Sequence, residues 1–259
     1  MSSKHELKNT GVEIDFVNIK DQTKLIQVGN NITKNIVLNI ENKHVNIEIN
    51  VGENSFIKVL ILSVHESNIK INLIGKVSRY GTLNLIAGFL NDHTELEAKI
   101  YLNDKYAEAN VNSLVVSHNN QQQKLYYEII NNATETNANI DVIGIGNDNG
   151  KVIVSGVGQI NKGMHNSNNF QHLTGVISDQ AVVEMNPYLL IDEHDVKAGH
   201  GATIGQVDEE ILYYMMSRGI PKKEAQTLYM KGVVSPFVDQ IFDKDLCEDF
   251  SKILWGESL

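Results

Sequence analysis

Short stretches in which apolar and polar residues alternate fill most of the chain. Ile36, Leu38 and Ile40 form one such stretch, and the next begins at Val45. Similar stretches recur about every nine to twelve residues from residue 31 to residue 157, separated by turns rich in Asn and Gly. Because successive side chains of a strand point to opposite faces, this pattern predicts many short β-strands. Weaker alternation over residues 1–30, carried by Val12, Ile14, Phe16 and Ile19, predicts one or two more.

Many regular short strands are typical of two architectures, a β-sandwich or barrel and a β-helix solenoid. The periodicity alone does not separate them. Asn recurs at the turns, as in Asn-Asp-Asn-Gly at residues 147–150, and Asn side chains in successive solenoid turns form ladders, which slightly favours the β-helix. If the body is a solenoid, Ile36, Ile47 and Ile71 should stack in one continuous core.

The stretch from residue 186 to residue 220 divides the strand-type sequence from a helical C-terminus. Residues 189–191 predict a buried strand, residues 192–195 an acidic turn, and residues 196–204 a last extended segment. Within that segment His200 lies between Gly199 and Gly201. Glycines on both sides allow backbone or ligand to approach the imidazole closely.

Apolar residues take helical spacing after residue 208. Asp208 is a suitable N-cap and Gly219 a suitable C-terminal stop for a helix over residues 209–218. A second helix is predicted from about Pro221, a third short one from Pro236 to residue 241, and a fourth around residues 246–254. We therefore predict a β body over residues 1–205 and a helical subdomain over residues 206–259, which could serve simply to cap the open end of a solenoid.

Composition excludes several classes of partner and site. The 259 residues carry a formal net charge of −10, which disfavours a nucleic acid or an anionic membrane as the main partner. The polar segment Met1–Thr10 lacks an apolar signal core and no apolar run is long enough to cross a bilayer, so a cytoplasmic protein is expected. The single cysteine, Cys247, excludes an intramolecular disulfide and a cluster held only by cysteines of one chain. We expect Cys247 to be buried.

Three other histidines have ordinary interpretations. His194 lies among acidic residues, where a solvated turn is favoured over a divalent metal site. His165 and His172 flank a polar loop and are expected at the surface. Neither a phosphate-binding glycine loop nor a hydrolase triad matches the spacing of the Gly and Ser residues.

A specific resemblance rests on three consecutive segments. Residues 195–203 read Asp-Val-Lys-Ala-Gly-His-Gly-Ala-Thr, residues 208–210 Asp-Glu-Glu, and residues 213–220 Tyr-Tyr-Met-Met-Ser-Arg-Gly-Ile. This pattern resembles the SufB/SufD family of iron–sulfur cluster assembly proteins, is nearest to SufD, and is specific over residues 151–241. The resemblance implies a mainly β fold with a right-handed β-helix core and a C-terminal helical subdomain. Family members typically carry a helical region before the β-helix, whereas strand-type alternation begins here near residue 12.

The resemblance also implies a function. It indicates a SufD-like scaffold subunit, not an enzyme, that pairs with a SufB-like subunit and binds the SufC-type ABC ATPase. His200 would act in cluster assembly at the subunit interface and is a candidate metal ligand; the alternative is a packing histidine. Ala198 takes the place of a cysteine found in some relatives, so a sulfur ligand would come from a partner. No stably bound cofactor is expected beyond a transient iron–sulfur cluster at the interface.

The resemblance places ATPase binding on the helical subdomain. The residues expected to contact SufC are Tyr213, Tyr214, Arg218, Gly219, Ile220 and Leu228. Arg218 also has a structural interpretation, because a cation at a helix C-terminus is stabilising.

Two other assemblies or functions remain open. The chain could form a homodimer with SufC as a minimal SufBD-type scaffold. It could instead be a β-solenoid that binds or cleaves carbohydrate, although 7% aromatic residues and a single Trp disfavour a sugar-binding groove.

Overall fold

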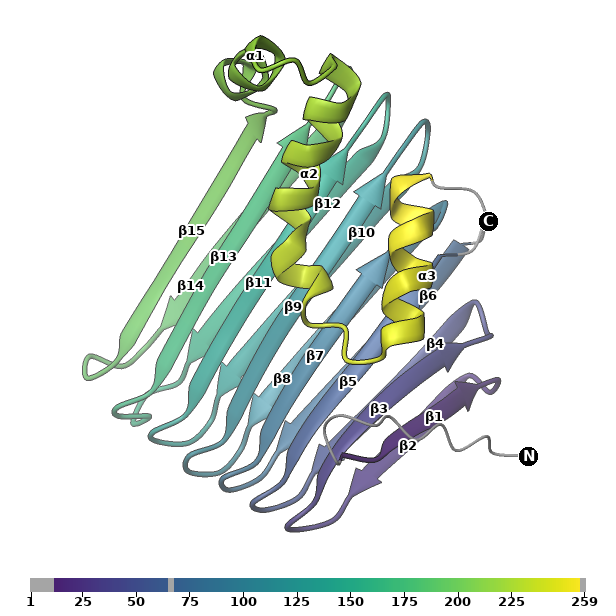
Figure 1. Cartoon of the computed structure of the whole chain (residues 1–259). Coiled ribbons are helices and arrows are strands. Elements are labelled where there is room, and N and C mark those ends of the chain that lie inside the picture. The colour runs from purple at the N-terminus through teal and green to yellow at the C-terminus, as the bar shows by residue number, and fades with distance from the viewer. Residues whose placement is uncertain (1–11, 65–67, 257–259) are drawn as a thin grey trace.

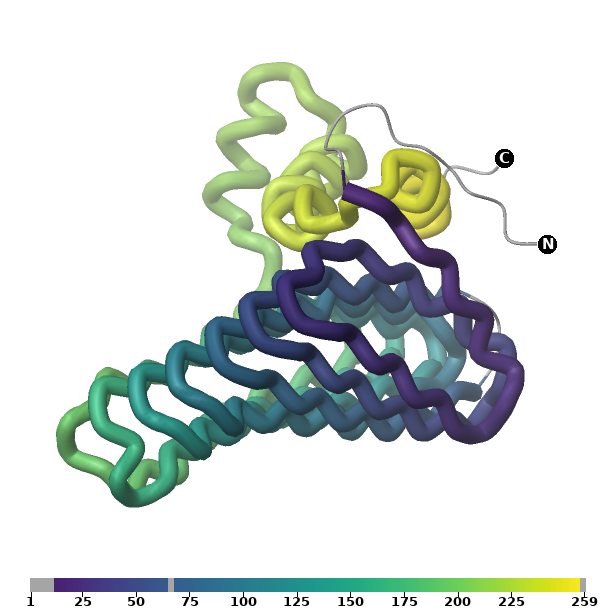
Figure 2. The backbone as a smooth tube through the Cα atoms, turned by 90° about the horizontal axis from the view of Figure 1, so that it is seen from below, coloured from purple at the N-terminus to yellow at the C-terminus, as the bar shows by residue number. Residues whose placement is uncertain are grey.

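The computed structural model describes residues 12–64 and 68–256, so the predicted polar segment at residues 1–10 lies outside the described residues. The described chain forms a parallel β-solenoid followed by three helices (Figure 1). Odd-numbered strands form one sheet, sheet A, and even-numbered strands form the other, sheet B. The chain therefore passes from one sheet to the other at every turn, as the stacked coils in Figure 2 show.

Each strand pairs in parallel with the strand two places along the chain. Sheet A contains β1 (Ile14–Ile19), β3 (Thr33–Ile40), β5 (Phe56–Ser63), β7 (Thr82–Phe89), β9 (Glu108–Ser117), β11 (Asn137–Gly146), β13 (Asn168–Ile177) and β15 (Lys197–Gln206). Sheet B contains β2 (Thr23–Val28), β4 (His44–Val51), β6 (Asn68–Val77), β8 (His93–Leu102), β10 (Gln122–Asn131), β12 (Lys151–Ile160) and β14 (Val182–Ile191). Hairpin-linked sandwiches pair consecutive strands antiparallel, so this connectivity confirms the solenoid.

The alternating residues meet inside the coil. Ile36, Ile47 and Ile71 belong to one continuous apolar core, which confirms their predicted stacking. Asn ladders form at the turns, as predicted: Asn132 Nδ2 donates to Asn103 Oδ1 at 3.2 Å, and Asn161 Nδ2 donates to Asn132 Oδ1 at 2.6 Å. Identical side chains can bond in this way because successive turns repeat the same backbone path.

Three helices follow the solenoid: α1 (Glu209–Ser217), α2 (Lys222–Val238) and α3 (Lys244–Trp255). Asp208 caps α1 as predicted, because its carboxylate accepts the backbone N–H groups of Glu210 and Ile211. Gly219 ends the helix with a φ of +90°, in the left-handed region that favours glycine. None of the helices formed by the described residues is long and apolar enough to cross a membrane.

The predicted helix starting at Pro236 is wrong, because α2 continues through Pro236 to Val238. A proline inside a helix lacks the N–H that would bond the carbonyl four residues earlier, here that of Gly232. The hydroxyl of Ser235 donates to that carbonyl instead, at 3.0 Å. Pro236 also lies in the last turn of α2, so little of the helix depends on the missing bond.

The helices do not cap the end of the solenoid, which corrects that interpretation. Instead α2 and α3 lie across the outer face of sheet A (Figures 1 and 2). There Leu60, Ile86 and Leu114 pack with Phe237 and Phe250 in a second apolar core. Many outward positions of the sheet A strands, such as Leu60, Ile86 and Leu114, are apolar. An apolar sheet face must be covered by another element, and here α2 and α3 cover it. β15 ends at Gln206, next to the predicted boundary between residues 205 and 206, but the division into two domains stays a prediction.

One glycine allows this close packing. A Cβ built at Gly88 on β7 would lie 2.8 Å from Cζ of Phe250 and 2.9 Å from Cδ2 of Leu62. The absence of a side chain at Gly88 thus makes room for the ring that α3 inserts against the sheet.

Candidate functional site

The last turn of the solenoid is uncovered. β14 and β15 end their sheets, and among the described residues no further strand pairs with either. The strand predicted at residues 189–191 exists, but its predicted burial is wrong, since Leu190 is 53% exposed. Tyr188 and Ile204 are exposed beside it. Tyr188 and Leu190 lie opposite Val157 and Gln159, on the outer face of sheet B. Ile204 lies opposite Gly175 and faces the interior, where no further turn of the described solenoid covers it.

His200 lies in the middle of β15, on this open end. In the register between β13 and β15 it is opposite Gln171, while Gly199 is opposite Phe170 and Gly201 opposite His172. Because faces alternate along a strand, His200 points to the same face as Gln171 and away from the face of His172. The imidazole of His200 is exposed, so it is available to a partner.

Gln171 is a residue that sequence reasoning missed. It is 4% exposed, and its Nε2 donates to the carbonyl of Tyr188 at 2.7 Å. Its Oε1 is buried without a hydrogen-bond partner among the described residues. Gly156 on β12 makes room for this amide, because a Cβ there would lie 2.6 Å from Oε1. The signal in the sequence was the pair Gly156 and Gly158 within a strand, where a side chain would normally fill the interior.

A hollow of about 360 Å³ lies beside β15. Asp141, Phe170 and His172 line it from the outer face of sheet A. Gln171 and His200 also border it, although their side chains point to the opposite face of the sheet. Partial burial raises the pKa of Asp141, and the neighbouring His172 opposes that shift. His172 is exposed, as predicted.

Glu193 holds the loop before β15. The Glu193 carboxylate accepts the backbone N–H groups of His194 and Gly163, both at 2.8 Å, and its Oε1 lies 3.4 Å from Nδ1 of His165. The hydrogen bonds from His194 and Gly163 lower the pKa of Glu193 to about 2. His165 and His194 are exposed, and residues 192–195 form the predicted acidic turn.

No three His, Cys, Asp or Glu side chains converge in a metal-binding geometry within residues 12–64 and 68–256. Cys247 on α3 is half-buried, less than expected, and partial burial raises the pKa of its thiol.

The residues predicted to contact an ATPase gather around α1, which stands off the sheets beyond the end of β15 (Figure 1). Tyr213 is 75% exposed, and Tyr214 and Leu228 are also exposed. The Arg218 guanidinium lies 5.2 Å from the Tyr214 ring centroid, in a cation–π contact. Gly219 and Ile220 form the link between α1 and α2.

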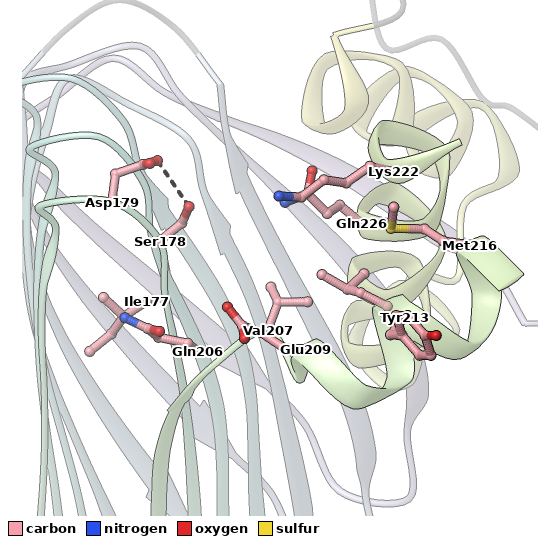
Figure 3. A pocket seen from close by; sticks show the side chains of 11 residues that line it. Ile177, Ser178, Asp179, Gln206, Val207, Glu209, Tyr213, Met216, Lys222 and Gln226 are labelled. Atoms are coloured by element: carbon pink, nitrogen blue, oxygen red, sulfur yellow. Dashed lines mark hydrogen bonds between the residues drawn. The ribbon is translucent and has the colours of Figure 1, made fainter. Parts of the chain in front are cut away.

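A pocket of about 480 Å³ separates this helical surface from the solenoid (Figure 3). Ser178 and Asp179, in the turn after β13, line one side, and Met216 and Lys222 line the other. Only Leu212 of α1 is buried. α1 is therefore an exposed amphipathic helix held at its two ends, a form that suits docking of another protein.

The described chain is thus a parallel β-solenoid with an uncovered last turn and an exposed helical surface. The family model described as "SUF system FeS cluster assembly, SufBD core domain" matches residues 18–233, and the chain belongs to this family. The resemblance drawn from residues 195–220 is thereby confirmed.

Individual proteins similar to this chain belong to the same family. The "Iron-sulfur cluster assembly protein SufD" of Bacillus subtilis is 35% identical over 158 residues, which are 60% of this chain and 36% of that protein. A SufBD family iron–sulfur cluster assembly protein of Mycobacterium leprae is 28% identical over 180 residues, 68% of this chain and 21% of the relative. A Staphylococcus saprophyticus member is 25% identical over 202 residues, 75% of this chain and 43% of the relative. The chain thus spans less than half the length of each of these proteins.

Proposed function

We propose that this chain is a non-enzymatic, SufD-like scaffold subunit for iron–sulfur cluster assembly. In this proposal the open end of the solenoid pairs with a SufB-like subunit, and α1 with the start of α2 binds a SufC-type ATPase. The observation that carries the proposal is the exposed His200 in the terminal strand β15, within a chain of the SufBD family.

The chemistry proposed for His200 follows from imidazole itself. A neutral imidazole offers a nitrogen lone pair to iron, and it can also take up or release a proton near neutral pH. Ala198, two residues earlier on β15, supplies no thiolate. Sulfur ligands for the transient cluster, the cargo of the assembly, would therefore come from the partner subunit.

The ATPase site is proposed on the exposed aromatic residues of the helices. Tyr213 and Tyr214 present large rings that lose little side-chain entropy on binding, which is why tyrosine is frequent in interface hot spots. Leu228 adds an exposed apolar contact from α2. Solvent-facing groups of this size are typical of a surface that a partner covers.

Substitution of His200 tests the first part. We expect His200→Ala and His200→Gln, purified anaerobically with SufB-like and SufC-type partners, to keep their assembly mass and melting temperature but to lose iron and sulfide by at least about tenfold. His172→Ala is the matched control, because it removes an exposed imidazole from the opposite face of the same sheet. Full cluster content in a stable His200→Ala complex would remove His200 from the mechanism.

Substitution on α1 tests the second part. Tyr213→Ala and Tyr214→Ala together should weaken binding of the SufC-type ATPase by about tenfold or more, as measured by calorimetry. Ile253→Ala on α3, also an exposed apolar residue, should leave the affinity unchanged. Point substitutions are preferred to truncation at Pro221, since loss of α2 and α3 would bare the apolar face of sheet A. If the Tyr213/Tyr214 double variant and Ile253→Ala lose the same amount of affinity for the ATPase, the contact does not lie on α1.

A further inference from the structure

α1 and the first half of α2 are joined only loosely to the rest of the chain. Leu212 is the one buried residue of α1, and Ala225 is the only buried residue of α2 within residues 222–232. The second half of α2 is held differently, because Val234 and Phe237 belong to the apolar core on sheet A. One end of this helix pair is therefore anchored and the other is not.

The pocket of about 480 Å³ lies beside the unanchored end, and apolar side chains line both of its walls. Ile177 and Val207 line the wall on the solenoid, and Tyr213 and Met216 line the wall on α1 (Figure 3). Tyr213 is 75% exposed and Met216 is 43% exposed. Apolar surface is stabilised when it leaves water, so contact between the two walls is favoured over a gap.

The two walls also carry opposite charges that do not meet. Lys222 extends from the start of α2 toward the turn that contains Ser178 and Asp179, as Figure 3 shows. The Asp179 carboxylate accepts a hydrogen bond from the Ser178 hydroxyl at 2.9 Å. Neither Asp179 nor Lys222 forms an ion pair with any residue in the described part of the chain. An ion pair between the two would need the walls to approach each other.

The wall that carries the acidic side chain is fixed. The backbone N–H of Ser178 donates to the carbonyl of Gly146 at 2.9 Å, and that of Gln180 donates to the carbonyl of Asp148 at 2.8 Å. These bonds tie the turn after β13 to the end of β11 and to the turn that follows it. The helical wall is therefore the one that can move.

The helical wall has two joints. Residues 207 and 208 alone link β15 to α1. Gly232 lies on the border between the unanchored and the anchored half of α2, and a Cβ there would meet no atom within 4 Å. Packing therefore does not require this glycine. Because a glycine adds backbone freedom and weakens a helix at its position, α2 can bend there.

We propose that α1 and the first half of α2 form a lid that closes onto the turn after β13 and is held shut by an ion pair between Lys222 and Asp179. Closure brings Tyr213 and Met216 against Ile177 and removes them from water. An exposed ion pair is weak, so a partner that binds only one form can shift the ratio of closed to open molecules.

The lid would also regulate the ATPase site, a consequence that rests on the proposed function. Tyr213 belongs to the surface proposed for the ATPase and also lines the pocket. The closed form would cover the ring of Tyr213. A SufC-type ATPase should therefore bind the open form and deplete the closed one.

Distances between two nitroxide spin labels on the full chain test the lid. The labels are attached through Gln180→Cys in the turn and Lys223→Cys on α2, both exposed, in a Cys247→Ser background. Double electron–electron resonance should show two distances, of which the shorter is the closed form. Lys222→Glu should reduce the closed fraction by at least about fivefold, because like charges then face each other. The reversed pair, Lys222→Glu with Asp179→Lys, should restore the closed fraction to within about twofold.

A matched label pair at Gln180 and Gln240 serves as the control. Gln240 follows the anchored end of α2 and is exposed, so this pair should show one distance that Lys222→Glu leaves unchanged. Melting curves confirm that each variant is folded. Raising the ionic strength should also open the lid of the native chain, because salt screens the ion pair.

Two results would overturn the lid. If the first label pair gives a single distance that neither Lys222→Glu nor ionic strength changes, α1 is fixed and the pocket is permanent. If the shorter distance persists in Lys222→Glu, the helices move but the ion pair does not hold them. ATPase binding without a fall in the closed fraction would overturn the regulatory role. Failure of the proposed function has a different signature, since the lid would close as described while the SufC-type ATPase failed to bind.

Discussion

The middle turns and the last turn of the solenoid have the same strand pattern but opposite environments. β11 and β15 each contain ten residues of sheet A, yet Ile140 and Val142 of β11 are buried while Ile204 of β15 is exposed. The difference is only that β11 has a strand on both sides and β15 on one. Alternation therefore defines two faces, but burial requires neighbours on both edges, and the turn that lacks one is free to present His200.

The charges follow the same contrast. On the outer face of sheet B, Lys70 and Lys76 of β6 pair with carboxylates of the two neighbouring turns, Glu95 on β8 and Glu48 on β4. In the last turn Glu193 lies 3.4 Å from His165, and its other carboxylates form no ion pair with the described residues.

The largest expected effect comes from deleting the same side chain in the two regions. Ile71 on β6 is 0% exposed, and Ile204 on β15 is 44% exposed. Ile71→Ala should lower the free energy of unfolding by about 3 kcal/mol, because it leaves a cavity in a continuous core. Ile204→Ala should change it by no more than about 0.5 kcal/mol. Chemical denaturation measures both, and similar losses would contradict the contrast between the turns.

A smaller effect is expected from adding a methyl group. Gly88→Ala places a Cβ against Phe250, so α3 must shift, at about 1–3 kcal/mol. Trp255, the only tryptophan, lies at the end of α3 and reports the shift by fluorescence. A Cβ at Gly205 on β15 would meet no atom within 4 Å, so Gly205→Ala should leave both the stability and the Trp255 fluorescence unchanged. An unchanged Trp255 spectrum in Gly88→Ala would show that the Phe250 ring accommodates the added methyl group without a shift of α3.

The smallest effect concerns pH and the loop of the last turn. Hydrogen bonds in the folded chain hold the pKa of Glu193 at about 2, below its value of 4.5 in the absence of partners. A lowered folded pKa stabilises the protein above about pH 4.5, and this stabilisation is lost as the pH falls from about 4.5 toward 2. Glu193→Gln should melt earlier than the native chain at pH 7, and the difference should shrink by pH 3. If the difference in melting temperature for Glu193→Gln stays constant with pH, the loop contact does not depend on the charge of Glu193.

Much of the candidate site could be predicted from local sequence. The cap at Asp208, the stop at Gly219 and the exposed position of His172 agree with the structure, because each depends on residues close together in the chain. The role of Gln171 was missed, since the glycine pair that makes room for its amide lies on a strand of the other sheet, and only the fold brings Gly156 next to Gln171. The roles of His200 and of the α1 residues stay predictions until the substitutions above are made.

The sequence by itself determined the strands, the helical C-terminus and the family, because alternation, capping residues and the motif around His200 are local properties. Only the tertiary structure decided where the helices lie and which strand faces are covered. Residues that touch in a solenoid are separated by a full turn of the chain, as Ile86 on β7 and Asn112 on β9 are in the sheet register. The apolar face of sheet A that binds α2 and α3, and the uncovered edge beside His200, exist only once the turns are stacked, since each is assembled from strands that are distant in sequence.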